Sequence, residues 1–280
     1  MARLRVLLGI ALGLGCAPLA ARDAPPPIPA NDPVTLDPTV PPALVQAGPS
    51  LDQRVTIPIH IDGKGPWNFI IDTGSQRTVI ARDLAERLAL PTRSTVTIIS
   101  MTGRSQATTV AVPRLGFGDD MLDDIEAPVL EGDDLGAPGL LGLDSLHAKR
   151  VLLNFRTGRM EISDSSARHR VAVDPDTIVV QARRRRGQLI LLDSEVNGMR
   201  VAIILDTGTN FSVGNLALRD RLIAKKRAPA MIEASLISVT GGQLTGQVGR
   251  IKSVRMGRVN MIDVPVLFAD ASPFVELGMQ

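Results

Sequence analysis

The 280-residue sequence contains no tyrosine, and aromatic residues make up only 2% of it. Hydrophobic residues still make up 44% of the chain, so Val, Ile, Leu and Ala must fill its cores. Because β-branched side chains are favoured in strands, this composition predicts a mainly β protein. The length allows about two domains, each with a core of its own.

Cysteine and histidine are also scarce. Cys16 is the only cysteine, which excludes an internal disulfide. His60, His147 and His169 are far apart and lack the Cys/His/Asp spacing of a zinc site, so we expect neither a metal nor a cofactor. The formal charge of +2 comes without a strong cluster of bases, so we expect no nucleic-acid partner.

Residues 1–21 have the layout of a secretory signal. Arg3 and Arg5 precede an apolar run at 6–14, and small residues follow it. The apolar run is too short to span a bilayer. Residues 22–50 are rich in proline and are expected to form an extended linker.

The cysteine lies near the end of this signal, in Gly13-Leu-Gly-Cys16-Ala17. This segment resembles the lipid-attachment site of bacterial lipoproteins, except that Gly13 stands where leucine is usual. Two products are therefore open: a protein lipidated at Cys16, or one cleaved near Ala20 or Ala21. Both predict export, to the periplasm or to a membrane-anchored lipoprotein in a bacterium.

The most informative motif occurs twice. Phe69-Ile-Ile-Asp-Thr-Gly-Ser75 and Ile203-Ile-Leu-Asp-Thr-Gly-Thr209 each carry an apolar, strand-like run into an Asp-Thr-Gly turn. The two aspartates, Asp72 and Asp206, are 134 residues apart. Ordinary Asp-Gly hairpin turns are flanked by polar residues, not by buried strands. The repeat therefore indicates two acids with a shared task.

An Asp-Thr-Gly turn behind an apolar strand resembles the active-site turn of aspartic proteases, and here of the retropepsin-like family. The resemblance implies a fold that brings Asp72 and Asp206 together. Two carboxylates in one site cannot both ionise cheaply, so one of them would hold a proton. The ionised partner would activate a water for attack on a peptide carbonyl.

By the same resemblance, the residues after each aspartate support the catalytic turns: Thr73, Gly74, Ser75, Thr207, Gly208 and Thr209. The two threonines would hydrogen-bond across the lobe interface. The glycines would donate backbone N–H groups to the carboxylates, and the two residues after the glycines would support the outer oxygens.

The elements around the two motifs recur in the same order, which predicts an internal duplication. We expect one retropepsin-like lobe at 51–165 and another at 188–280, joined by a basic linker at 166–187. In each lobe a short helix should follow the catalytic turn, at 81–90 and at 216–223. The predicted fold class is mainly β, with duplicated retropepsin-like β-barrel lobes and short helices.

Each lobe also has a hairpin that resembles a protease flap by its order along the chain. The candidate flap residues are Met101, Thr102 and Gly103 in the first lobe, and Val239, Thr240, Gly241 and Gly242 in the second. A polypeptide substrate would lie beneath the flaps as an extended strand and pair through its backbone.

Leu140-Leu-Gly142 resembles the apolar-apolar-Gly element that packs behind the catalytic turn in retropepsin-like domains. We expect a short helix after it, capped by Asp144 or Ser145. Leu277-Gly-Met279 stands at a similar distance after its own aspartate, but nothing corresponding to residues 145–162 follows it. The second lobe is therefore expected to be C-terminally incomplete: either the chain is a fragment or the lobe borrows these elements.

The sequence thus predicts an aspartic endopeptidase, a hydrolase with both lobes on one chain. A second hypothesis stays open, namely a non-catalytic protease-fold module that binds extended peptides. A monomeric pseudo-dimer is expected, with a homodimer as the alternative. The predicted partner is a polypeptide substrate, and membrane anchoring is predicted only if Cys16 is lipidated.

Overall fold

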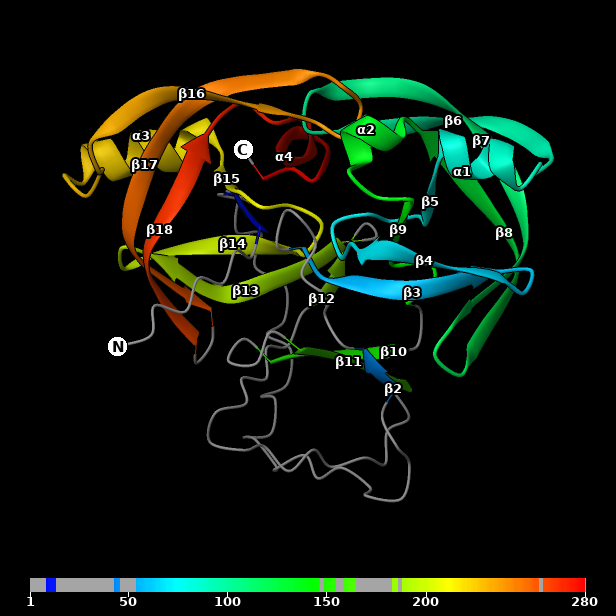
Figure 1. The fold of residues 1–280 in the computed structure, drawn as a ribbon. Coiled ribbons are helices and arrows are strands. Elements are labelled where there is room, and N and C mark those ends of the chain that lie inside the picture. Colours follow the sequence, from blue (N-terminus) through cyan, green and yellow to red (C-terminus); the bar gives the residue numbers. More distant parts are fainter. Residues whose placement is uncertain are drawn as a thin grey trace, which may run out of the picture.

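A computed structural model of the chain describes residues 9–13, 43–45, 54–146, 149–154, 159–164, 183–185, 188–256 and 259–279. Most of them form two β lobes that lie side by side, the first coloured light blue to green and the second mainly yellow-green to red in Figure 1. The mainly β, two-lobed fold is therefore confirmed. Cys16 and most of the predicted linkers lie outside the described residues.

The first lobe is a seven-stranded sheet in the order β3-β4-β9-β5-β8-β7-β6. Its strands are β3 (Thr56–Ile61), β4 (Lys64–Ile71), β5 (Val79–Ala81), β6 (Thr92–Ser100), β7 (Gly103–Phe117), β8 (Asp120–Leu130) and β9 (Gly139–Leu141). Strand β3 also pairs with β7, so the sheet closes on itself. Two short helices, α1 (Arg82–Arg87) and α2 (Gly132–Leu135), complete the lobe.

The second lobe is an eight-stranded sheet in the order β12-β13-β14-β1-β15-β18-β17-β16. Its strands are β12 (Arg183–Arg185), β13 (Gln188–Val196), β14 (Met199–Asp206), β1 (Gly9–Gly13), β15 (Ser212–Gly214), β18 (Val259–Phe268), β17 (Gln243–Met256) and β16 (Met231–Ile237). Strand β13 also pairs with β17. The helices are α3 (Leu216–Ala224) and α4 (Ser272–Glu276).

The two sheets repeat one another strand for strand. From β13 onwards, each strand of the second sheet takes the place of its counterpart in the first, with β14 at the place of β4 and β15 at the place of β5. Strand β12 is the only member of this sheet without such a counterpart. The duplication expected from the sequence is thus present in the topology.

The place of β9 is filled differently in the second lobe. Strand β1, from the predicted signal, lies between β14 and β15 and runs antiparallel to β14, whereas β9 runs parallel to β4. Leu277-Gly-Met279 does not stand there, so that assignment is wrong. Gly278 follows α4 at a φ of 65°, as Gly136 follows α2 at 65°, so the segment belongs to a helix end. Strand β1 thus takes the place of β9 only, and the elements at 145–162 have no counterpart among the described strands of the second lobe.

Three other expectations differ from the structure. Residues 143–146, after Gly142, form a turn and not a helix, and Ser145 N donates to Asp144 Oδ1 at 2.7 Å. Strands β10 (Lys149–Asn154) and β11 (Arg159–Asp164) pair with β2 (Ala43–Val45) in a separate sheet, which lies below the lobes in Figure 1. Part of the basic linker is strand β12, because its backbone pairs with β13.

Burial explains how each catalytic turn is positioned. Phe69, Ile70 and Ile71 at the end of β4 are all 0% exposed and belong to the single core of the first lobe. In the second lobe, Ile203 and Ile204 at the end of β14 belong to two separate core clusters. Each aspartate therefore leaves a strand that is anchored in its lobe. Among the described helices, none is long and apolar enough to cross a membrane.

Candidate active site

Asp72 and Asp206 meet between the lobes, directly after β4 and at the end of β14. Their carboxyl groups lie close enough to act on the ionisation of one another. A Cβ on Gly74 would lie 2.5 Å from Asp206 Oδ2, and a Cβ on Gly208 would lie 2.5 Å from Asp72 Oδ2. Only glycine at these two positions lets each carboxyl group approach the opposite turn.

Thr73 and Thr207 lock the two turns to each other. Each backbone N–H donates to the Oγ1 of the other threonine at 3.1 Å. The hydroxyls donate in turn to backbone carbonyls of the opposite strand, from Thr73 to Leu205 O at 2.8 Å and from Thr207 to Ile71 O at 2.6 Å. Thr73 is 2% and Thr207 7% exposed, so these bonds are shielded from water.

Each turn also donates backbone N–H groups to its own carboxylate. Gly74 N and Ser75 N donate to Asp72 Oδ1 at 2.8 Å and 2.9 Å. Gly208 N donates to Asp206 Oδ1 at 2.8 Å. The glycines therefore lie as the resemblance implies, with each one serving its own aspartate.

The sequence led us to expect that the hydroxyls of Ser75 and Thr209 support the outer oxygens of the two aspartates. The structure shows other partners for them. Ser75 Oγ donates to Arg77 O at 2.6 Å, and Thr209 Oγ1 bonds to both the carbonyl and the N–H of Phe211. A short hydroxyl side chain satisfies its own turn more readily than a more distant group. These hydroxyls shape the turns, and the carboxylate donors of the first turn are backbone N–H groups.

The two aspartates are electrostatically different. Burial and the charge of Asp72 raise the pKa of Asp206 well above its ordinary value of 3.8. Burial also raises the pKa of Asp72, but the N–H bonds from its turn, the bond from Asp206 and the charge of Arg54 oppose that rise. Burial therefore favours one shared proton on the pair, and the larger rise at Asp206 favours that residue as its holder.

Sequence reasoning missed Arg54. It lies just before β3, and Ile71 N donates to the neighbouring Val55 O at 2.9 Å, which brings this segment beside the catalytic turn. No local motif marks such a residue. Only the pairing of β3 with β4 reveals that its charge acts on Asp72.

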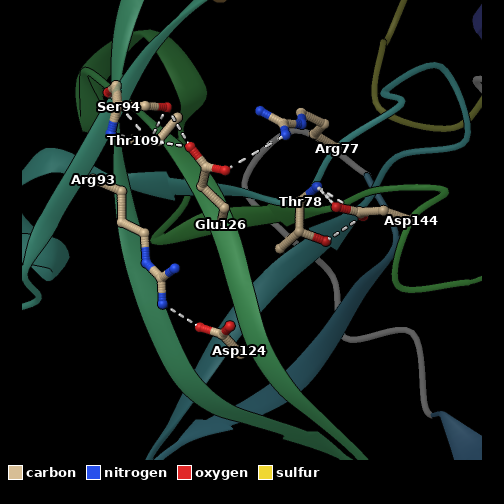
Figure 2. Close-up of polar contacts among 8 residues, drawn as sticks. All are labelled: Arg77, Thr78, Arg93, Ser94, Thr109, Asp124, Glu126 and Asp144. Carbon is tan, nitrogen blue, oxygen red and sulfur yellow. Dashed lines mark hydrogen bonds and ion pairs between the residues drawn. The ribbon is translucent and has the colours of Figure 1, made fainter.

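Asp144 supports the first catalytic turn from behind. Its carboxylate accepts hydrogen bonds from Thr78 N at 2.8 Å and from Thr78 Oγ1 at 2.8 Å, as Figure 2 shows. Thr78 Oγ1 also accepts from Gly142 N at 3.1 Å. Asp144 thus joins the Leu-Leu-Gly element to the catalytic turn and takes no part in the aspartate pair. In the second lobe Ser212 stands six residues after Asp206, where Thr78 stands after Asp72.

The candidate flap of the first lobe is the turn between β6 and β7, formed by Met101, Thr102 and Gly103. It reaches across to the second lobe. Met101 packs against a core cluster of that lobe, and its carbonyl accepts from Ser272 N at 3.1 Å. Arg104 then donates to Glu276 Oε1 from Nε at 3.0 Å and from Nη2 at 2.6 Å. The first flap is thus attached to α4.

The second flap candidate is the loop between β16 and β17, formed by Val239, Thr240, Gly241 and Gly242. Val239 packs against the first-lobe core, and Thr240 Oγ1 donates to Ser100 Oγ at 2.9 Å. A Cβ on Gly242 would lie 2.3 Å from Thr102 Oγ1, so the two tips touch. Each flap therefore crosses to the opposite lobe.

The described residues contain no group of three or more His, Cys, Asp or Glu side chains that could hold a metal ion. A comparison with curated proteins finds no match. Residues 57–148 match the family described as "gag-polyprotein putative aspartyl protease", and residues 192–280 match the family described as "Aspartyl protease". Each matched region contains one of the two Asp-Thr-Gly turns.

The chain is therefore a tandem of two aspartyl protease family domains. The duplicated sheets and the paired turns agree with the retropepsin-like family, so the resemblance read from the sequence is confirmed at the level of family and fold.

Proposed function

We propose that this chain is an aspartic endopeptidase in which both catalytic aspartates come from one polypeptide. One observation carries the proposal: the carboxyl groups of Asp72 and Asp206 meet at the lobe interface, each against the glycine of the opposite catalytic turn. The reciprocal bonds of Thr73 and Thr207 fix this pair. A binding module has no need for two buried acids that share one proton.

The chemistry follows from the protonation states. The Asp72 carboxylate would take a proton from a water as that water attacks the peptide carbonyl. Asp206 would give its proton to the carbonyl oxygen, where negative charge develops. The exchange needs no covalent intermediate, and the pair would return to its starting state once the amine leaves with a proton.

The test is peptide cleavage by the full chain, measured with a diverse mixture of quenched fluorescent peptides at several pH values. Asp72→Asn and Asp206→Asn should each abolish cleavage and leave the circular dichroism spectrum unchanged. Asp123→Asn is the matched control, because that carboxyl group is 76% exposed and pairs only with Arg114 among the described residues. A pepstatin-like transition-state mimic should inhibit the wild type.

Two results would contradict the proposal. Full activity in either Asn variant would exclude the pair as the catalytic centre. A wild-type chain that binds peptides tightly but cuts none at any pH would favour the binding module, which is the alternative function.

A further inference from the structure

The two catalytic turns carry different side chains at equivalent positions. Five residues after each aspartate stand Arg77 in the first lobe and Phe211 in the second. Ser75 and Thr209 fold their turns in the same way, each bonding to the backbone of the residue two positions on. Arg77 and Phe211 therefore occupy equivalent places in the two catalytic turns. The Arg77 side chain is 44% exposed, and Phe211 is 57% exposed.

In the first lobe, Arg77 borders a polar cluster on strands β6, β7 and β8, which Figure 2 shows. Glu126 Oε1 accepts hydrogen bonds from Ser94 Oγ and from Thr109 Oγ1, the latter at 2.6 Å. Glu126 Oε2 lies 4.0 Å from Arg77 Nη2. The bonds from Ser94 and Thr109 lower the pKa of Glu126, so this carboxyl group is ionised.

The strand registers identify the counterparts in the second lobe. Ile80 pairs with Val129 in the first lobe, and Gly214 pairs with Phe268 in the second. Ile80 and Gly214 each stand eight residues after their aspartate, so β8 position 129 corresponds to β18 position 268.

The same shift of 139 residues aligns the β7–β8 hairpin of the first lobe with the β17–β18 hairpin of the second. The residue pairs next to the turns are Phe117–Asp120 in the first hairpin and Met256–Val259 in the second. It places Val248 at the position of Thr109 and Pro265 at that of Glu126. Val248 pairs with Ile232, which stands where Ser94 stands beside Thr109.

The counterpart of the polar cluster is therefore entirely apolar. It consists of Phe211, Ile232, Val248 and Pro265, in place of Arg77, Ser94, Thr109 and Glu126. Ile232 is 71% exposed and Pro265 is exposed as well, whereas Val248 packs against a core cluster, so the difference extends from the core to the surface. The two lobes thus share one backbone topology but differ at these equivalent positions, which are polar in the first lobe and apolar in the second.

We infer that these two clusters are equivalent side-chain subsites of the peptide cleft, related by the pseudo-twofold axis of the two lobes. The subsite at Arg77 takes an acidic side chain, and the subsite at Phe211 takes an apolar one. The inference rests on the proposed function, because it places an extended peptide across the aspartate pair. Substrates then carry an acidic residue on one side of the cut bond and an apolar residue on the other side, at the same distance from the bond.

An acidic side chain fits better than a basic one at the polar subsite. Glu126 Oε1 already accepts two hydroxyl bonds, and Oε2 faces Arg77. The separation of 4.0 Å exceeds hydrogen-bond length, and this is the only ion pair of Arg77 within the described residues. Its guanidinium therefore keeps donors for a ligand carboxylate, which it can bind through two parallel bonds.

The experiment measures peptide binding as well as cleavage. Four fluorescent peptides of equal length carry acidic or apolar residues in their two halves: acidic then apolar, apolar then acidic, both acidic, and both apolar. Binding is measured with the full-length Asp72→Asn protein and cleavage with the wild type. One mixed order should bind and be cut better than either uniform peptide, and about tenfold better than the peptide with two apolar halves, the effect of one charge-assisted hydrogen bond.

Charge reversal then assigns the subsite. Arg77→Glu should shift the preference of the favoured order from an acidic to a basic half, and should change KM more than kcat. Arg114→Glu is the matched control, because Arg114 pairs with Asp123 and is not among the charges that act on Glu126. Phe211→Ser should remove the preference for the apolar half, whereas Ile262→Ser, at a position 74% exposed on β18, should not.

Equal binding of all four peptides would overturn this inference, and so would a preference that Arg77→Glu leaves unchanged. Failure of the wild type to cut any peptide would contradict only the proposed function. The binding measurements would then still decide whether the two subsites exist.

Discussion

Thr73 and Thr207 exchange hydrogen bonds across 134 residues of sequence, each backbone N–H donating to the other's Oγ1 at 3.1 Å. Both side chains are buried, and both hydroxyls also donate to a strand of the opposite lobe. These bonds connect the lobes at the point where the aspartates meet. Lobe docking and catalytic geometry therefore depend on the same two side chains.

Thr73→Val should destabilise the protein and reduce any cleavage activity. The change keeps the size of the side chain but leaves Thr207 N–H and Leu205 O without their partner. An unsatisfied buried donor costs about 1–3 kcal/mol, so we expect a loss of roughly 2 kcal/mol or more in the free energy of unfolding. Urea denaturation followed by fluorescence measures it.

Thr245→Val is the control for this loss. Thr245 and Ser235 form an exposed hydroxyl pair at 3.0 Å, so its removal should change the free energy of unfolding by less than about 0.5 kcal/mol. If the two variants are equally stable, the threonine exchange does not hold the lobes together.

The raised pKa of Asp206 makes stability fall as the pH rises. Its folded-state pKa lies above the ordinary value of 3.8, so the native state binds more protons than the unfolded state above that pH. The stabilisation is complete below about pH 4 and is lost as the pH rises through the raised pKa. Asp206→Asn cannot ionise, so it should gain stability relative to the wild type as the pH rises above about 4, until the raised pKa is passed.

Denaturation midpoints at a series of pH values measure this gain. Asp123→Asn, outside the aspartate pair, should follow the wild-type pH dependence. A constant difference between wild type and Asp206→Asn at every pH would show that Asp206 carries no perturbed proton.

The ion pair between Arg104 and Glu276 should hold the first flap on α4. Arg104→Glu places two like charges at this contact, and an exposed ion pair is worth about 0.2–1 kcal/mol. We expect a KM increase of about two- to fivefold and faster limited proteolysis of the flap turn at 101–103. Adding Glu276→Arg should restore both.

Arg82→Glu provides the matched control for flap closure. Arg82 and Glu131 form an ion pair of similar length, 2.7 Å, but both residues belong to the first lobe. If both charge reversals increase proteolysis of the flap equally, then net charge and not the contact with α4 controls the flap.

The local features of the site were predictable from the sequence. The apolar run before each aspartate, the Asp-Thr-Gly pattern and its repetition locate Asp72 and Asp206 without any tertiary information. The turns at 101–103 and 239–242 were also predicted, from the order of the elements along the chain. These features depend only on neighbouring residues, so sequence patterns contain them.

What the sequence could not predict depends on pairing between distant strands or on very short elements. Arg54 acts on Asp72 only because β3 lies beside β4. Helices α2 and α4 span four and five residues, which is too short for a helical pattern of apolar residues. The assignment of Leu277 failed for the same reason, since α4 was not recognised just before it.

The last prediction concerns β1, which supplies backbone partners to β14 from Gly9 opposite Asp206 to Gly13 opposite Ala202. Backbone groups in a sheet interior exchange slowly only while they are paired. A chain that begins at residue 22, as export would produce, should therefore show faster amide exchange in β14 and β15 than the full chain. Exchange in β4 and β5 should stay unchanged, because β9 pairs with them in both chains. Equal protection of β14 in the two chains would show that β1 does not complete the second sheet.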